Sequence, residues 1–340
     1  MSEITLIEET ARRTIADGLT PAVIEAAEHG AWAGELWDQL AAQGLLQPAA
    51  IAQDAAEALE IEAAVIRAIT AAATPLPVVE TILAGAFLVQ HRLEVPAAPL
   101  SLAAFDDSDR LSLTNGRVSG RLARVPWGRD VAAVVAVAGD CLLLLETRSA
   151  NPSRGLNMAN EPRDTLEFKE ATPLARATGV DSDALLARCA AARALQLAEA
   201  AARVLELTVE YAANRKQFGR PIGNFQAIQH QIAAAASEVA SARVAAQQAR
   251  LALAAGKNAL MACAIAKARA NDAAAAVARM GHQVHGAIGF TQEYQLHRYT
   301  RRIQSWRHEF GASAYWNRRI GELILRDGER SVWSILTATA

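Results

Sequence analysis

The feature that most constrains the fold is a hydrophobic periodicity that changes twice along the chain. Residues 3–93 and the stretch from about residue 182 onward place apolar side chains at helical spacing, whereas residues 100–171 carry strand signals. We therefore predict a mainly α fold with a small β domain. Its three parts are an N-terminal helical domain (residues 1–98), a middle antiparallel β domain (99–175) and a C-terminal four-helix bundle (176–340).

The strand signals of the middle part are two tight turns. "LSLTNGRVSG" sets Asn115-Gly116 between alternating segments, and this dipeptide favours a hairpin because both turn residues tolerate a positive φ. "DVAAVVAVAGDCLLLLE" joins two apolar runs at Gly139-Asp140, and "DTLEFKEA" offers a further alternating strand. Two prolines in "EVPAAPL" mark the end of the helical pattern before this region.

The helical regions show ordinary amphipathic signals. In "WAGELWDQLAAQGLL", Leu36, Leu40 and Leu45 fall near one face and Gly44 lies near a helix end. The C-terminal region contains three or four long segments rich in Ala, which permits close approach of helix backbones in a bundle. We expect this bundle to assemble further, into a dimer of dimers.

Composition excludes several classes of function. A net charge of −2 provides no general field for nucleic acid or an anionic membrane, and 52% apolar residues are typical of a folded globular chain. The three scattered cysteines lack metal-ligand spacing and indicate reduced thiols. The opening residues "MSEITLIEETARR" lack a signal-peptide pattern, and no apolar run is long enough to span a bilayer. We expect a soluble, cytoplasmic protein.

A short stretch in the last third interrupts the helical pattern. "NRKQFGRPIGNFQAIQHQIA", residues 214–233, crowds Gly, Pro, aromatic and cationic residues between two Ala-rich helical segments. Such a stretch is compatible with a simple turn between two antiparallel helices, with charges at the helix ends. It is also compatible with a binding site, because the next helix would begin near Asn224 and Phe225 and offer unpaired N–H groups to an anion.

This stretch and a second one resemble a known family. "RKQFGRPIGNFQAIQHQIA" and "QVHGAIGFTQEYQLHRY" are similar to the two flavin-contacting segments of the acyl-CoA dehydrogenase family, and the order of helices, β domain and bundle is similar over nearly the whole chain. The Arg-x-x-Phe-Gly-x-x-Ile-x-x-Phe-Gln run is the most specific part. The resemblance implies an acyl-CoA dehydrogenase-like fold with FAD as cofactor.

The resemblance also implies which residues contact FAD, whose diphosphate and adenine are held in this family by the bundle of a neighbouring subunit. Arg215 would donate two parallel hydrogen bonds to the diphosphate, because a guanidinium is planar and rigid. Phe218 would cover the adenine or ribose, and Phe225 and Gln226 begin the helix that faces the cofactor. The second segment would meet the adenine end through three residues, Gln283, Gly286 and Ala287.

Two histidine patterns in this region allow a metal as an alternative. His282 and His285 form an H-x-x-H pair, and Glu293 and His297 lie four residues apart. Neither pattern is completed by further ligands. We therefore expect helix-end or core histidines and a local pair, and no metal site.

The reaction implied by the family is α,β-dehydrogenation of an acyl-CoA, with an electron-transfer flavoprotein or a similar acceptor. A carboxylate removes the proton at Cα while the flavin accepts hydride from Cβ. Counting from Arg298 places Arg307 where the family usually has this glutamate, and an arginine cannot serve as a base. The alternative family position, around Cys189, has no carboxylate either. Glu309 is the one remaining candidate base.

The β domain also departs from the sequence pattern of the family. The family runs that bracket the flavin ring are replaced by "AAFDDSD" and "VPWGRD", so that Ser108 and Trp127 are weak equivalents. Short, diverged chains of this kind resemble one subunit of heteromeric acyl-CoA dehydrogenases that act on fatty acid or sterol side chains, in which an unlike partner supplies the glutamate. An inactive homomeric assembly or regulatory protein, and a homomeric enzyme that uses Glu309, remain as alternatives.

Overall fold

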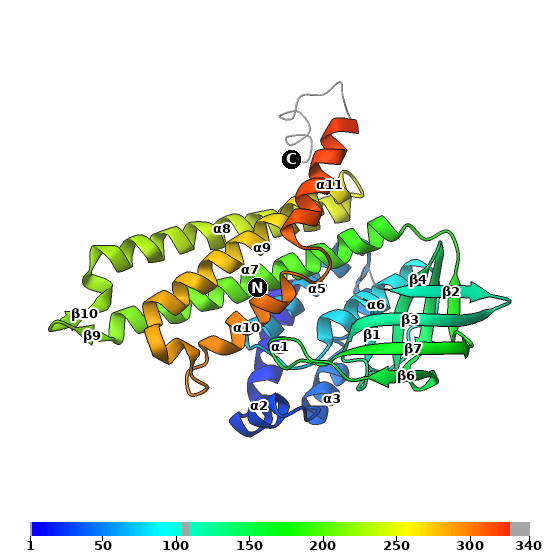
Figure 1. The fold of residues 1–340 in the computed structure, drawn as a ribbon, viewed down its shortest axis with the longest axis horizontal. Coiled ribbons are helices and arrows are strands. Elements are labelled where there is room, and N and C mark those ends of the chain that lie inside the picture. Colours follow the sequence, from blue (N-terminus) through cyan, green and yellow to red (C-terminus); the bar gives the residue numbers. More distant parts are fainter. Residues whose placement is uncertain (1, 104–108, 327–340) are drawn as a thin grey trace. The chain divides into compact units, whose positions relative to one another are not determined.

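A computed structural model describes residues 2–103 and 109–326 of the 340-residue chain. The chain divides into two compact units, residues 1–189 and 190–340, and the boundary falls inside the longest helix, α7 (Ser182–Asn214). The class predicted from sequence, mainly helical with a small β region, is confirmed (Figure 1). The proposed domain boundary at 98/99 lies between the last N-terminal helix and the first strand, and the one at 175/176 falls within the last strand of the β region.

Six helices form the N-terminal part of the first unit. Side chains of Ser2, Thr20 and Asp54 accept hydrogen bonds from the backbone three residues later, and so cap the first, second and fifth helices. Leu36 and Leu40 of the third helix are buried, as the spacing predicted. The bounds are α1 (Glu3–Gly18), α2 (Pro21–Glu28), α3 (Gly34–Ala42), α4 (Pro48–Ile51), α5 (Ala55–Ala71) and α6 (Val78–Gln90).

The β region forms two four-stranded sheets around one apolar core, with strand orders β1-β4-β5-β8 and β2-β3-β7-β6. The bounds are β1 (Leu100–Leu102), β2 (Arg110–Thr114), β3 (Arg117–Pro126), β4 (Ala133–Ala138), β5 (Cys141–Glu146), β6 (Ala150–Ser153), β7 (Arg163–Ala171) and β8 (Ala175–Ala177). Both predicted hairpins are present, since Thr114 pairs with Arg117 and Ala138 pairs with Cys141.

One strand pair departs from the antiparallel arrangement of the β region. Strands β1 and β4 pair in parallel, with Leu100 opposite Ala133. Parallel neighbours need a long crossover connection, and the β2–β3 hairpin lies in the connection between these two strands. The other strand pairs within the two sheets are antiparallel.

The second unit is built on three long helices, α7, α8 (Gln226–Ala255) and α9 (Ala259–His285). Helices α8 and α9 run antiparallel (Figure 1), and small residues such as Ala242, Ala249 and Ala270 are fully buried, which allows close helix packing. The remaining elements are β9 (Lys216–Gln217), β10 (Arg220–Pro221), the 3₁₀ turns η2 (Ile222–Asn224) and η3 (Gly286–Phe290), α10 (Leu296–Trp306) and α11 (Ser313–Arg326). The last helical part of the described chain consists of two helices, α10 and α11. None of the described helices is long and apolar enough to cross a membrane.

Candidate functional site

The break in the helical pattern is a small hairpin. Helix α7 ends at Asn214, and β9 pairs with β10 so that Gln217 lies opposite Arg220. The two turn residues between them, Phe218 (φ 52°) and Gly219 (φ 80°), are both left-handed, as a two-residue turn of this type requires. Phe218 is 92% exposed and adopts a backbone conformation that is unfavourable for an aromatic residue. A large apolar side chain is therefore held in solvent on a strained turn, which is a common property of binding sites.

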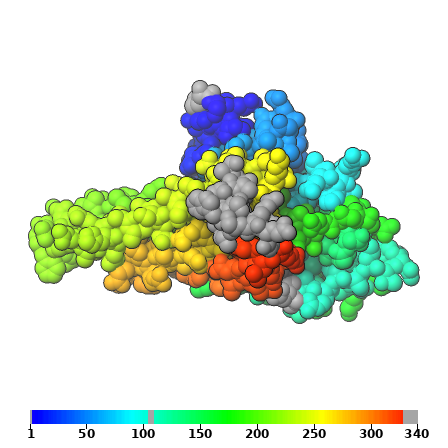
Figure 2. All heavy atoms as spheres, turned by 90° about the horizontal axis from the view of Figure 1, so that it is seen from above, coloured from blue at the N-terminus to red at the C-terminus, as the bar shows by residue number. Residues whose placement is uncertain are grey.

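The hairpin lies beside the end of α9 and forms one wall of a pocket of about 370 Å³. In Figure 2 the yellow-green atoms of this region form one end of the bundle. Five of the seven predicted cofactor contacts line the pocket, although they come from two segments about 60 residues apart: Arg215, Phe218, Phe225, Gln283 and Gly286. The other two, Gln226 at the start of α8 and Ala287 in η3, are exposed next to the pocket in the chain but do not line it.

The pocket offers donors for an anion. The guanidinium of Arg215 is exposed and has no hydrogen bond or ion pair within the part of the chain that the structure describes. Helix α8 begins at Gln226, and the residue before it, Phe225, provides no side-chain cap. The first N–H groups of a 30-residue helix therefore point toward this end of the bundle without such a partner. Both features suit a phosphate group.

The pocket also offers flat apolar surfaces. The ring of Phe225 lies 6.1 Å from that of Phe218, edge to face, and the Arg220 guanidinium covers it at 4.3 Å. Ile222 and Ile228 complete this side of the pocket. The hydrogen bond from the Gln229 side chain to the Gly223 carbonyl (2.9 Å) fixes the turn that carries them.

Sequence reasoning missed Tyr211 as a member of the pocket. His285 stacks on Tyr211 with ring centroids 4.4 Å apart, and both line the pocket. The Nδ1 atom of His285 lies 2.7 Å from the Gly281 carbonyl, and Nε2 lies 3.2 Å from the Tyr294 hydroxyl. Burial lowers the pKa of His285, so its neutral form donates to the carbonyl and accepts from Tyr294. One signal was available, because Tyr211 precedes Arg215 by one helical turn and shares its face.

The second histidine of the pair is engaged elsewhere. His282 stacks on Phe290, with centroids 4.2 Å apart, and its Nε2 lies 3.0 Å from the Thr300 hydroxyl. Burial, followed by the neighbouring His285, lowers the pKa of His282. Across residues 2–103 and 109–326 no three His, Cys, Asp or Glu side chains come together as a metal site would need.

The candidate base Glu309 has a different environment. It follows α10, and its carboxylate lies 2.8 Å from a guanidinium nitrogen of Arg193 on α7. The Arg193 side chain is 1% exposed and the Glu309 side chain 13%. Glu309 lines neither the pocket at the hairpin nor the pocket described below. The structure thus places it in a buried ion pair, apart from the predicted cofactor contacts.

Trp127, the weak equivalent that the structure describes, does not lie on an open surface that could bracket a flavin ring. Trp127 is 6% exposed and has a left-handed φ of 48°, and the guanidinium of Arg163 lies 5.0 Å from its ring centroid. The carboxylate of Asp164, fully buried, binds the backbone N–H and the guanidinium of Arg129. Residues of this region therefore fill the space around Trp127. Ser108 lies outside the described residues.

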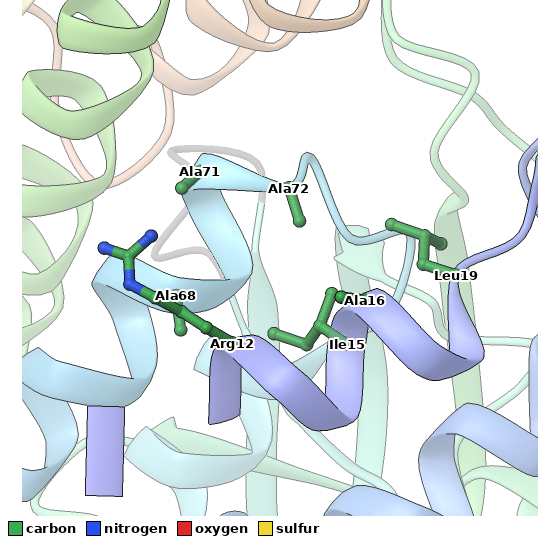
Figure 3. Close-up of a pocket in the computed structure, with 7 residues that line it drawn as sticks. All are labelled: Arg12, Ile15, Ala16, Leu19, Ala68, Ala71 and Ala72. Atoms are coloured by element: carbon green, nitrogen blue, oxygen red, sulfur yellow. The ribbon is translucent and has the colours of Figure 1, made fainter. Parts of the chain in front are cut away.

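A second pocket, of about 290 Å³, lies between α1 and α5 (Figure 3). Its walls are aliphatic, and its charged member, Arg12, is paired with Glu8 at 2.7 Å. None of the predicted site residues lines it. The hairpin pocket of the second unit is therefore the better candidate for a cofactor site.

Comparison with known proteins agrees with this fold. The family model described as acyl-CoA dehydrogenase, C-terminal domain, matches residues 183–325. The acyl-CoA dehydrogenase IpdE2 of Mycobacterium tuberculosis is 31% identical over 309 residues, which cover 87% of this chain and 89% of that protein. The chain belongs to the acyl-CoA dehydrogenase family.

Solved structures show the same fold at lower identity. A variant of the Tcur3481–Tcur3483 steroid ACAD has a TM-score of 0.88 at 24% identity, over 96% of this chain and 99% of that one. The ChsE4–ChsE5 complex of Mycobacterium tuberculosis has a TM-score of 0.84 at 23% identity, over 96% and 98%. Members of this family are flavoproteins that typically bind FAD and oxidise CH–CH bonds of acyl-CoA thioesters.

Proposed function

We propose that this chain is one subunit of an FAD-dependent acyl-CoA dehydrogenase, which shares its flavin site with an unlike partner that supplies the catalytic glutamate. The observation that carries the proposal is the hairpin pocket. Its lining includes Arg215, Phe218, Phe225, Gln283 and Gly286. The guanidinium of Arg215 has no partner among the described residues. A pocket with an unengaged cation and aromatic walls fits one end of a dinucleotide.

In the proposed site each group has a separate task. Arg215 and the start of α8 bind the diphosphate, because both present N–H donors to negative charge. Phe218 and Phe225 cover the adenosine and exclude water from it, and Gln283 hydrogen-bonds its polar edge. FAD, when bound, supplies the acceptor for the hydride that leaves Cβ.

The unlike partner is proposed because the candidate base of this chain is engaged in a contact within the described residues. Glu309 is the candidate, and its carboxylate is already held by the buried Arg193. The burial of Trp127 under Arg163 supports the same division of labour, because a second chain would then provide the surface that faces the flavin ring.

The substrate and setting follow from the relatives by analogy. A steroid ACAD and a complex of two named chains are among the structures with this fold, so we propose a sterol-type or other bulky acyl-CoA as the substrate. We further propose a cytoplasmic tetramer, arranged as a dimer of dimers, that passes electrons to an electron-transfer flavoprotein or a similar acceptor.

Co-expression tests this proposal. The chain is purified alone and together with a second acyl-CoA dehydrogenase-like chain from the same source, and the visible absorbance of flavin and acyl-CoA oxidation are measured for both. We expect flavin and turnover in the mixed oligomer alone. A yellow, active protein from this chain by itself would contradict the need for a partner, and a colourless, inactive mixed oligomer would favour an assembly or regulatory role.

A further inference from the structure

The connection between α10 and α11, residues 307–312, has an unusual conformation. Phe310 (φ 53°) and Gly311 (φ 95°) are both left-handed, and the Phe310 side chain is buried. A non-glycine residue in this region costs free energy, so surrounding contacts must hold it there. This strained turn is what divides the last helical segment into two helices.

A buried lysine holds this turn from α9. Lys267 is fully buried, and its Nζ lies 2.9 Å from the Gly311 carbonyl, 3.4 Å from the Arg307 carbonyl and 2.7 Å from Oδ1 of Asn271. Backbone carbonyls cannot donate a hydrogen bond, and an ammonium has three donors whereas a neutral amine has two. Three oxygen acceptors around one nitrogen therefore match the charged form of the lysine.

A buried arginine holds the same turn from α7. The Arg193 guanidinium pairs with Glu309 at 2.8 Å and hydrogen-bonds the side chain of Gln196. It also lies 5.2 Å from the ring centroid of Trp306, at the end of α10, and 5.3 Å from that of Phe310 in the turn. In addition, the indole N–H of Trp316 donates to the Phe310 carbonyl (2.8 Å). The turn is therefore fixed from α7, α9 and α11.

The charges of Lys267, Arg193 and Glu309 depend on one another. Burial, followed by the positive charge of Arg193, lowers the pKa of Lys267 well below its ordinary value, and the negative charge of Glu309 opposes this. Glu309 thus compensates two buried cations, one by direct contact and one through space. Removing its charge would leave both cations without that compensation.

We infer that residues 307–312 form a latch in which Lys267 and Arg193 fix the α10–α11 turn and Glu309 is the counter-ion of the latch, not the base of the reaction. Lys267 and Arg193 then have a structural role, which is to hold the turn. The inference deepens the proposed function, because it explains why a partner must bring the base. The latch itself needs neither flavin nor partner.

Amide hydrogen exchange of the purified full-length chain tests the latch. In Glu309→Gln we expect amides of residues 307–312 to exchange about tenfold faster or more, with a lower Tm, because a buried ion pair has lost one partner. Glu322→Gln is the matched control, since its α11 carboxylate pairs with the exposed Arg318 at 3.0 Å, and we expect no change there. Unchanged exchange and Tm in Glu309→Gln would overturn the latch.

Two further measurements separate a latch from a base. In the mixed oligomer, Glu309→Gln should keep kcat within about threefold of the parent, since it removes no group from the reaction. A loss of kcat by orders of magnitude with exchange unchanged would make Glu309 the base.

A double-mutant cycle tests the coupling. Combining Glu309→Gln with Arg193→Met should lower the free energy of unfolding by less than the sum of the two single changes. Should Arg193→Met fail to fold, Arg193→Lys takes its place in the cycle, and strict additivity there would contradict direct coupling.

If the chain binds no flavin under any condition, the proposed function fails, but the exchange and coupling results still decide the latch. The two ideas can therefore be tested separately.

Discussion

Two regions of the second unit use the same kinds of residue in opposite ways. Each combines a left-handed aromatic residue, a left-handed glycine and nearby cations: Phe218-Gly219 with Arg215 at the hairpin, and Phe310-Gly311 with Arg193 at the α10–α11 turn. At the hairpin the aromatic ring is 92% exposed and the guanidinium has no partner among the described residues. At the turn the ring is 2% exposed and the guanidinium is paired.

The difference teaches how to separate a binding element from a structural one. Strain that the protein's own contacts stabilise belongs to the fold, whereas strain that is left exposed beside unused donors fits the binding element that we propose at the hairpin. Changes at the turn should therefore lower the stability of the chain. Changes at the hairpin should lower ligand affinity and leave stability nearly unaltered.

The largest effect is expected at Gly311. The backbone at Gly311 has a φ of +95°, and an added Cβ would overlap the Trp316 ring, so Gly311→Ala should destabilise the chain by at least about 3 kcal/mol. Gly256 is the matched control, since it is also left-handed but has open space around it, and Gly256→Ala should cost about 1 kcal/mol. Urea unfolding of both variants measures the difference, and equal losses would show that packing around the turn is unimportant.

Removal of the buried lysine should have the next largest effect. Lys267→Met removes a donor from three oxygen acceptors, of which the Gly311 carbonyl keeps the Asn271 side-chain amide at 3.3 Å. Relief of the buried charge offsets part of this cost, which gives a net loss of about 2 kcal/mol. Lys257→Met, at an exposed lysine after α8, should change the free energy of unfolding by less than about 0.5 kcal/mol. A Lys267→Met chain as stable as the parent would contradict the role assigned to the ammonium.

At the hairpin, the expected change is in affinity. Arg215→Ala should weaken flavin binding to the mixed oligomer about tenfold to hundredfold, because one charged donor group to the diphosphate is lost. Lys216→Ala removes a neighbouring exposed cation that does not line the pocket and should have little effect. Fluorescence titration with FAD measures both, and equal losses would mean that the hairpin acts through general charge and not through a specific contact.

The smallest effect on stability is expected at Phe218. Phe218→Gly relieves a left-handed aromatic residue but adds backbone entropy to the unfolded chain, so the free energy of unfolding should change by less than about 0.5 kcal/mol. Flavin affinity should nevertheless fall about fivefold, because an aromatic face over the adenosine is lost. Loss of stability without loss of affinity would reverse the comparison between the two regions.

Much of the fold could be predicted from local signals. Asn115-Gly116 and Gly139-Asp140 specify their hairpins through backbone preference alone, and the start of α8 at Gln226 follows from the Gly and Pro residues before it. The parallel pairing of β1 with β4 could not be predicted in this way. It depends on how a long connection crosses the sheet, which no local pattern encodes.

In the second unit, too, local sequence patterns do not reveal contacts between residues that are distant in the chain. Arg215 and Phe218 belong to one motif, and the pocket that joins them to Gln283 agrees with the motif-based hypothesis. The Arg193–Glu309 pair links residues more than 100 positions apart, and nothing next to Glu309 in the sequence indicates it. Sequence counting could find the carboxylate nearest the expected base but not the guanidinium that holds it.

The central claim is that the hairpin pocket holds the adenine and diphosphate half of FAD in the assembled oligomer. An experimental structure of the purified mixed oligomer with saturating FAD tests it most directly. We predict cofactor density between Arg215 and Gln283, with Phe218 against it. An oligomer that contains FAD elsewhere, or none at saturation, with this pocket empty, would contradict the claim.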